Sequence, residues 1–170
     1  MAAPFLARPD MMYKDSYIAG TREFEAEKRP FRWKIEMLDE HFDEYLQVLH
    51  DKEFDPDPGS VPQSEYWLIA DGAYVGNLRL RHALNESLMQ WGGNIGYEIR
   101  ASQRGRGYGL LQCQLGLEKA REIGLERVLI TCDDSNIASA KIIEACGGGL
   151  ENTIVLPDSP IPKRRYWITL

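Results

Sequence analysis

The sequence predicts an α+β domain, residues 1–170, in which helices lie on both faces of a mixed and mostly antiparallel sheet. Two observations support this prediction. A strand–helix–strand–helix segment lies between two hairpins, and a crossover through a helix brings its two strands, 94–100 and 127–132, together in parallel. The composition, with 44% hydrophobic and 27% charged residues, is that of one globular domain with a sizeable core.

The first thirty residues are expected to contain one strand and one helix. Residues 4–13 are expected to form the strand. A helix is predicted over 16–28, where apolar and charged residues recur in an amphipathic pattern. Asp15 or Ser16 is expected to cap this helix, and Pro30 is expected to end it.

A second helix is predicted to follow a short extended piece at 31–35. We expect Asp39 to cap it, because four apolar residues then recur at helical spacing: Phe42, Tyr45, Leu46 and Leu49. Residues 55–62 hold three prolines and a glycine, so they are predicted to form a loop. Such a loop either borders a binding site or is a plain connector.

The first hairpin is predicted from strands 65–70 and 73–81, because a tight Asp71-Gly72 turn separates them. Residues 82–93 are expected to be irregular. The remaining predicted elements are two helices and a closing pair of strands around a proline-rich turn. The helices are predicted at 110–123 and 137–145, the strands at 150–156 and 163–169, and the turn at 157–162.

A basic, glycine-rich loop joins the first parallel strand to the helix that follows it. Glycines at 105, 107 and 109 alternate with other residues, and Arg104 and Arg106 lie among them. Glycine lets the backbone turn sharply and lets another group approach closely. The helix that follows directs unpaired N–H groups and the positive end of its dipole towards the loop. The segment is therefore predicted to hold a small polyanion such as a pyrophosphate, although it fits neither a P-loop nor a Rossmann fingerprint.

Two motifs in this order resemble those of the GCN5-related N-acetyltransferases. The first is R-x-x-G-x-G, formed by Arg104, Gly107 and Gly109. The second follows the strand at 127–132 and consists of an Asn, a small residue three positions later and a Gly: Asn136, Ser139 and Gly147. Together they cover residues 94–149. The resemblance implies that the parallel strands splay apart to receive the pantetheine arm of acetyl-CoA.

The same resemblance implies the residues that bind acetyl-CoA. The backbone of Ile99 and Ala101 would contact the acyl and pantetheine groups, residues 104–109 would hold the pyrophosphate, and Asn136 would reach the pantetheine arm. The full set expected to contact the cosubstrate is Ile99, Arg100, Ala101, Arg104, Gly105, Arg106, Gly107, Tyr108, Gly109, Asn136 and Ser139.

The catalytic groups are less clearly indicated. Many family members carry a Tyr seven residues after the Asn, where it protonates the departing thiolate, but this chain has Ile143 there. Such a departure resembles the branch that includes ribosomal-protein N-terminal acetyltransferases, and the whole chain is closer still to bacterial predicted acetyltransferases of unassigned acceptor. An alkyl amine is mostly protonated at pH 7, so a base is expected. The candidates are His82, at the end of the first hairpin, and Glu98, on the motif strand, although relatives often have a small residue at the position of Glu98.

Charge and cysteine usage exclude other classes. A net charge of −6 argues against general nucleic-acid binding, and no apolar run reaches the roughly 20 residues of a membrane span. Three scattered cysteines favour a reducing cytoplasm and argue against a disulfide framework or a metal site. None of the cysteines lies in a nucleophile motif, so we expect direct transfer from a ternary complex.

The sequence thus predicts an N-acetyltransferase that moves an acetyl group from acetyl-CoA to a primary amine of a small molecule or of a peptide or protein N-terminus. A monomer or homodimer is expected. The alternative is a non-catalytic acyl-CoA-binding or sensor module, and a third reading is a structural domain with a chance glycine loop.

Overall fold

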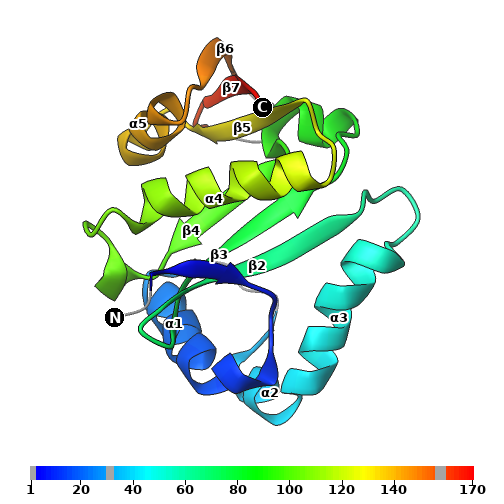
Figure 1. Cartoon of the computed structure of the whole chain (residues 1–170), viewed down its shortest axis with the longest axis vertical. Helices are drawn as coiled ribbons and strands as arrows, with labels where there is room; N and C mark the ends of the chain where they lie inside the picture. The colour runs from blue at the N-terminus through cyan, green and yellow to red at the C-terminus, as the bar shows by residue number, and fades with distance from the viewer. Residues whose placement is uncertain (1–2, 30–32, 156–159) are drawn as a thin grey trace.

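A computed structural model describes residues 3–29, 33–155 and 160–170. Within these residues seven strands form one open sheet in the order β1-β2-β3-β4-β5-β7-β6 (Figure 1). Only β4 and β5 pair in parallel, which confirms the predicted mixed sheet. The strands are β1 Phe5–Ala7, β2 Gln63–Ala70, β3 Ala73–Arg81, β4 Ile95–Ile99, β5 Arg127–Asp133, β6 Gly149–Ile154 and β7 Lys163–Thr169.

Helices cover both faces of the sheet, as predicted (Figure 1). Helices α1 (Lys14–Ala26), α2 (Ile35–Glu40) and α3 (Phe42–Phe54) pack on one face of the β2–β3 hairpin. Helices α4 (Tyr108–Glu122) and α5 (Ile137–Ala145) pack on the other face. Each face therefore has its own apolar core.

Alternation along β2 divides these two cores. Trp67 and Ile69 face α1–α3, whereas Tyr66 and Leu68 face the opposite side. Trp67 is fully buried and stacks on Tyr17 of α1 with ring centroids 4.2 Å apart. Such an aromatic stack adds about 0.5–1.5 kcal/mol beyond the area it buries, so it fixes α1 on the sheet.

The parallel pair of strands is joined at one end only. Ile95 opposite Ile130 is the single register pair between β4 and β5 within the described residues. Next to it, the buried Asn94 side chain donates from Nδ2 to the Arg81 carbonyl at 3.2 Å and accepts at Oδ1 from the Leu129 amide at 2.8 Å. Its backbone N–H also donates to the Leu129 carbonyl at 2.7 Å. Asn94 therefore ties β3, β4 and β5 together, and beyond Ile95 the two parallel strands diverge.

The N-terminal predictions were partly wrong. The first strand is only Phe5–Ala7, because the Asp10 side chain accepts from the Met12 amide and starts a 3₁₀ turn at Met11–Tyr13. Helix α1 begins at Lys14, so neither Asp15 nor Ser16 caps it. The Ser16 hydroxyl instead accepts from the Tyr74 amide at 3.1 Å. A tertiary contact has thus replaced the predicted local one.

Asp39 does not cap a helix either. It lies inside α2, an unpredicted short helix, and its carboxylate pairs with Lys14 at 3.0 Å. His41 occupies the N-cap of α3, whose predicted apolar face is confirmed by the burial of Phe42, Tyr45 and Leu49. Pro30 and the first two residues of the extended piece expected at 31–35 lie outside the described residues.

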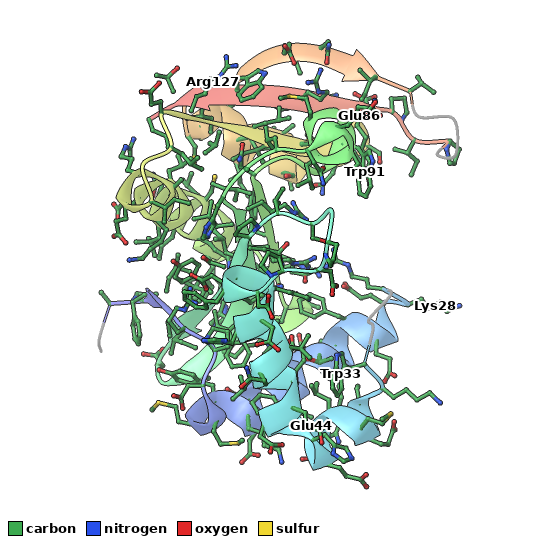
Figure 2. All side chains as sticks on the ribbon, turned by 90° about the vertical axis from the view of Figure 1, so that its right-hand side faces the viewer. Lys28, Trp33, Glu44, Glu86, Trp91 and Arg127 are labelled. Atoms are coloured by element: carbon green, nitrogen blue, oxygen red, sulfur yellow. The ribbon has the colours of Figure 1, made fainter. Side chains whose placement is uncertain are left out.

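The later elements agree with the sequence more closely. The hairpin with its Asp71-Gly72 turn, both helices of the motif region and the closing strands are confirmed. The first half of the turn predicted at 157–162 lies outside the described residues. The segment predicted to be irregular contains one π-helical turn, Leu88–Gly92. Its Trp91 lies on the β5–β7 side of the molecule, in the opposite half from Trp33 on the α1–α3 side (Figure 2).

We predict that Asn94→Ala lowers the free energy of unfolding by about 2–4 kcal/mol, because it leaves two buried backbone groups without partners. Urea unfolding would measure this. The control is Asn152→Ala on the exposed edge strand β6, where a change within about 0.5 kcal/mol is expected. Equal effects of the two variants would contradict the role given to Asn94.

Candidate active site

A cavity of about 680 Å³ opens where β4 and β5 diverge. We call it the loop cavity, because the glycine-rich loop forms one wall and α5 forms another. It brings together nine of the residues predicted from the sequence: Glu98, Ile99, Arg104, Gly105, Gly107, Tyr108, Gly109, Asn136 and Ser139. Lys141 of α5 also lines it, and adds a cation that the motifs did not indicate.

The backbone of β4 presents polar groups to this cavity. In an antiparallel pair, only every second residue exchanges hydrogen bonds with its partner strand. Here the Arg81 amide donates to the Asn94 carbonyl at 2.7 Å, and the Arg100 amide donates to the Val75 carbonyl at 3.0 Å. The even-numbered residues of β4 therefore bond to β3. The N–H groups of Tyr97 and Ile99 consequently point towards the gap that β5 leaves open.

The loop itself has the conformation of an anion cradle. Gly105 and Gly107 have φ of +75° and +82°, values that side chains rarely adopt, and Gly107 is the N-cap of α4. A Cβ on Gly107 would meet no atom within 4 Å, so the space in front of the helix N-terminus is open. The first amides of α4 and its dipole favour a negatively charged group there.

The arginines of this segment hold the loop rather than project into the cavity as a cluster. Arg104 donates from Nε to the Ile99 carbonyl at 2.9 Å and pairs with Glu27 of α1 at 2.5 and 2.7 Å. Arg106 and Ala101, both exposed, are absent from the lining of the loop cavity, as is Arg100. Of the three arginines in this segment, Arg104 alone lines the loop cavity, so the loop does not present an arginine cluster to it.

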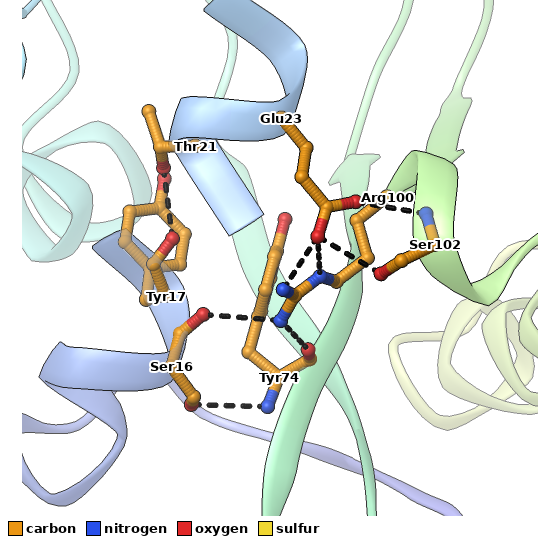
Figure 3. A network of polar contacts seen from close by, with 7 residues as sticks. All are labelled: Ser16, Tyr17, Thr21, Glu23, Tyr74, Arg100 and Ser102. Carbon is orange, nitrogen blue, oxygen red and sulfur yellow. Dashed lines mark hydrogen bonds and ion pairs between the residues drawn. The ribbon is translucent and has the colours of Figure 1, made fainter. Parts of the chain in front are cut away.

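Arg100 belongs to a network that joins α1 to the end of β4 (Figure 3). Glu23 accepts from Arg100 Nη2 at 2.6 Å and from the Ser102 amide at 2.8 Å. Arg100 Nη1 in turn donates to the Tyr74 carbonyl at 3.2 Å. Partial burial raises the pKa of the Glu23 carboxyl, but the hydrogen bonds from Arg100 and Ser102 outweigh this, and the pKa lies below its ordinary value.

The α5 residues of the cavity are ordered by their own contacts. Asn136 caps α5, since its Oδ1 accepts from the Ser139 amide at 3.1 Å. The Ser139 hydroxyl lies 3.2 Å from the Tyr97 hydroxyl. Burial raises the pKa of Tyr97, so this hydroxyl stays protonated at neutral pH. Ile143, which stands where many relatives have Tyr, is fully buried in the core.

A second cavity of about 630 Å³ lies on the opposite face of the sheet, between the β2–β4 strands and α1 and α3. We call it the tyrosine cavity, because Tyr17, Tyr45 and Tyr74 line it. Burial raises the pKa of each of these three tyrosines. These three rings therefore form an uncharged, aromatic part of a wall that also contains charged side chains.

Glu98 and Arg29 line both cavities, so the two spaces meet at Glu98. The Glu98 carboxylate accepts a hydrogen bond from Arg79 at 3.1 Å and forms an ion pair with Arg29 at 3.0 Å. Because successive side chains of a strand alternate, Glu98 faces the side opposite the Tyr97 ring, which packs against the α4–α5 core.

The structure does not place His82 beside Glu98. Its Nε2 lies 2.7 Å from the Ser64 hydroxyl, and its amide donates to the Pro62 carbonyl at 2.9 Å. His82 is absent from the lining of both cavities. It therefore fastens the end of β3 to the start of β2.

The floor of the tyrosine cavity contains two polar residues that the sequence reasoning missed, Glu65 and Asn77. Both are buried, at 5% and 6% exposure. The signal was present in the first hairpin, because Glu65 alternates in phase with Trp67 and Ile69. A carboxylate at such a core-facing position requires a partner or a function.

The whole arrangement matches known proteins. The model of the acetyltransferase (GNAT) domain family matches residues 7–148, and the chain therefore belongs to this family. No curated protein matches the sequence. The chain is an acetyltransferase, and the predicted family, its fold and its donor, acetyl-CoA, are confirmed.

Solved structures share the fold at low sequence identity. The chain is similar to the microcin C7 self-immunity acetyltransferase MccE in complex with acetyl-CoA and AMP (14% identity, TM-score 0.70, 100% of this chain and 94% of that one). It is also similar to Mycobacterium smegmatis RimJ in complex with CoA-disulfide (16%, 0.73, 96% and 80%). A third similar structure is the ribosomal L7/L12 α-N-protein acetyltransferase RimL in complex with coenzyme A (15%, 0.71, 100% and 96%).

We predict that Glu23→Gln lowers the unfolding free energy at pH 7 by about 1–2 kcal/mol, because it removes charge-assisted hydrogen bonds from a partly exposed carboxylate. A carboxyl whose pKa is lowered by folding stabilises the protein above its unfolded pKa, and this contribution is lost as pH falls through the folded pKa. The difference between wild type and variant should therefore shrink below about pH 4.5.

Denaturant unfolding across pH would measure this dependence. Glu25→Gln is the control, because Glu25 is exposed on the same helix. A difference that stays constant from pH 7 to pH 3 would contradict the assignment to the Glu23 carboxylate.

Proposed function

We propose that the protein transfers the acetyl group of acetyl-CoA directly to a primary amine, with the cosubstrate in the loop cavity and the amine in the tyrosine cavity. The observation that carries this proposal is the meeting of the two cavities at Glu98, on opposite faces of the diverging strands. A thioester that enters along β4 from one side would meet an amine that enters from the other. No covalent relay is then required.

The residues of the loop cavity suit acetyl-CoA. The pyrophosphate would bind to the amides of residues 104–109 and to the N-terminus of α4, and Lys141 would supply a nearby cation. The pantetheine arm would lie between β4 and α5, next to Asn136 and Ser139. The N–H of Ile99 points into this gap and would polarise the thioester carbonyl, a contribution of about 3–4 kcal/mol per donor in comparable sites.

The reaction then needs two proton movements. Glu98 accepts the proton of the incoming amine, so that the neutral nitrogen attacks the carbonyl carbon. The C–S bond breaks and CoA leaves as a thiolate. The proton that the attacking nitrogen must still lose to become an amide passes through water to the thiolate sulfur, because Ile143 supplies no acid. A thiol has an ordinary pKa near ~8.5, so its thiolate is a tolerable leaving group.

The cysteines support direct transfer. Burial raises the pKa of Cys113, Cys132 and Cys146, and a thiol with a raised pKa is a poor nucleophile at neutral pH. The similarity to RimL, a ribosomal L7/L12 α-N-protein acetyltransferase, and to MccE supports either a peptide N-terminus or a small molecule as acceptor. Release of CoA with an amine distinguishes this function from a binding module without turnover.

We predict that Gly107→Ala weakens acetyl-CoA binding at least about tenfold, because the added Cβ strains the cradle and occupies the space for a phosphate. Gly124→Ala is a matched control. Gly124 also has a positive φ and open space where a Cβ would lie, but it is at the other end of α4. Calorimetry should show weakened binding for the first variant alone, and equal affinities would remove the support for this cradle.

We predict that Glu98→Gln lowers kcat/KM about 100-fold, since a general base contributes about 10²–10⁴-fold to rate. The acidic limb of the pH profile of kcat/KM should also disappear, while acetyl-CoA affinity is retained. His82→Gln, measured in parallel, should keep the wild-type profile. If both variants keep the wild-type rate and profile, solvent rather than Glu98 removes the proton.

A further inference from the structure

The floor of the tyrosine cavity contains a polar patch of four side chains, and Glu98 is the member of this patch that the proposed acetyl transfer uses. Glu65 on β2 pairs across the strands with Arg79 on β3, and Asn77 on β3 pairs with Glu98 on β4. The four side chains therefore share one face of three neighbouring strands. We call Glu65 and Asn77, at the β2 side of this patch, the inner subsite.

The inner subsite contains oxygen atoms that can accept further hydrogen bonds. Asn77 Nδ2 donates to Glu65 Oε1 at 3.0 Å, and this bond orients the amide. Asn77 Oδ1 is buried and has no hydrogen-bond partner in the part of the chain that the structure describes. A buried carbonyl oxygen without a donor costs about 1–3 kcal/mol elsewhere in proteins, so a bound donor would be stabilised here.

The charges of the cavity are divided between its two ends. Arg79 donates to Glu98 and Arg29 forms an ion pair with it, so these three groups form one cluster at the β4 side, from which Arg79 also attracts the charged form of Glu65. Lys52 and Asp57 line the cavity from α3 and the loop after it. The hydrogen bond that Glu65 accepts from Asn77 comes from a neutral amide, so Glu65 is the carboxylate that a ligand cation would meet at the inner end.

The surroundings favour a cation over a neutral donor. Tyr17, Tyr45 and Tyr74 present aromatic rings in the same cavity, and a cation against such a ring gains about 0.5–2 kcal/mol in comparable sites. Burial raises the pKa of Glu65 even though Arg79 attracts its charged form. A glutamine of the same shape would therefore lose less solvation free energy on burial than the charged carboxylate does. The chain nevertheless keeps a carboxylate there.

We propose that the inner subsite binds a second, positively charged group of the acceptor, an ammonium or a guanidinium, while the reacting amine lies at Glu98. Glu65 and Asn77 Oδ1 would accept its N–H groups. Because neighbouring strands lie about 4.8 Å apart, the second group would lie one to two strand spacings, roughly 5–10 Å, from the reacting nitrogen. This inference rests on the proposed function and narrows its acceptor to dicationic amines.

Three probes with the same six-carbon chain test the proposal: 1,6-diaminohexane, hexylamine and 6-aminohexanoate. Wild-type protein should use the diamine with a kcat/KM at least about 30-fold above that of the other two. Glu65→Gln should reduce this ratio to below about threefold, and Asn77→Leu should reduce it as well. Asp57→Asn removes the same charge at the exposed mouth of the cavity and should keep at least half of the preference.

A second pair of probes distinguishes the source of the second cation. Short peptides that begin with lysine or with norleucine differ only in the side-chain ammonium. If the protein prefers both the lysine peptide over the norleucine peptide and the diamine over hexylamine, the subsite binds a cation on a peptide acceptor as well. If it prefers only the diamine, the acceptor is a small molecule. Both results support the inner subsite.

Calorimetry on the CoA-loaded protein separates failure of the inference from failure of the proposed function. Equal use of hexylamine and the diamine, or preference for 6-aminohexanoate, overturns the inner subsite and leaves the acetyl transfer intact. Preferential binding of the diamine without CoA release from acetyl-CoA supports the subsite and overturns the proposed transfer. If all three probes neither bind nor turn over, both proposals are wrong.

Discussion

The buried Asn94 side chain is the contact on which the site depends. A parallel pair of strands would normally close along its length, and a closed pair would leave no entrance between β4 and β5. Asn94 satisfies backbone groups of both neighbouring strands at one end, so the sheet remains continuous there while the other end stays open. The N–H groups of Tyr97 and Ile99 remain unpaired with β5 because this closure is local.

The open end of β4 is stable because side chains at the end of α1 bind it in place of β5. Glu23 binds Arg100 and the turn that follows, and Glu27 binds Arg104 in the glycine-rich loop. The end of β4 is thus fixed from the face opposite α5. Both cavities depend on this arrangement. Strand β4 lines the loop cavity, and helix α1, which holds the end of β4, lines the tyrosine cavity.

Sequence reasoning recovered the features that depend on local chemistry. The Asp71-Gly72 turn and the turn at the loop glycines are each specified by neighbouring residues, and each was predicted. The helix starts near 15 and 39 were wrong, because Ser16 and Asp39 bind residues distant in the sequence instead of capping a helix. Local propensity gives way wherever a tertiary partner offers the same hydrogen bond.

The site residues divide in the same way. Those expected to bind acetyl-CoA through the backbone lie within one continuous motif, and the resemblance to the family was enough to locate them. The tyrosine cavity is assembled from α1, α3 and three strands, so its lining could not be derived from any single stretch. Glu65 and Asn77 come together only through the register of β2 and β3, and the isolation of His82 likewise follows from where β3 ends.

Helix α1 has one further consequence. One side of it carries Tyr17, Thr21 and Phe24 into the tyrosine cavity, and the other carries Glu23 and Glu27 to the far end of β4 and the loop. A rigid helix cannot shift on one side without shifting on the other. Under the proposed function, a shift of α1 on binding of acetyl-CoA would therefore also alter the tyrosine cavity, and thermodynamic reciprocity would require each ligand to change the affinity of the other by the same factor.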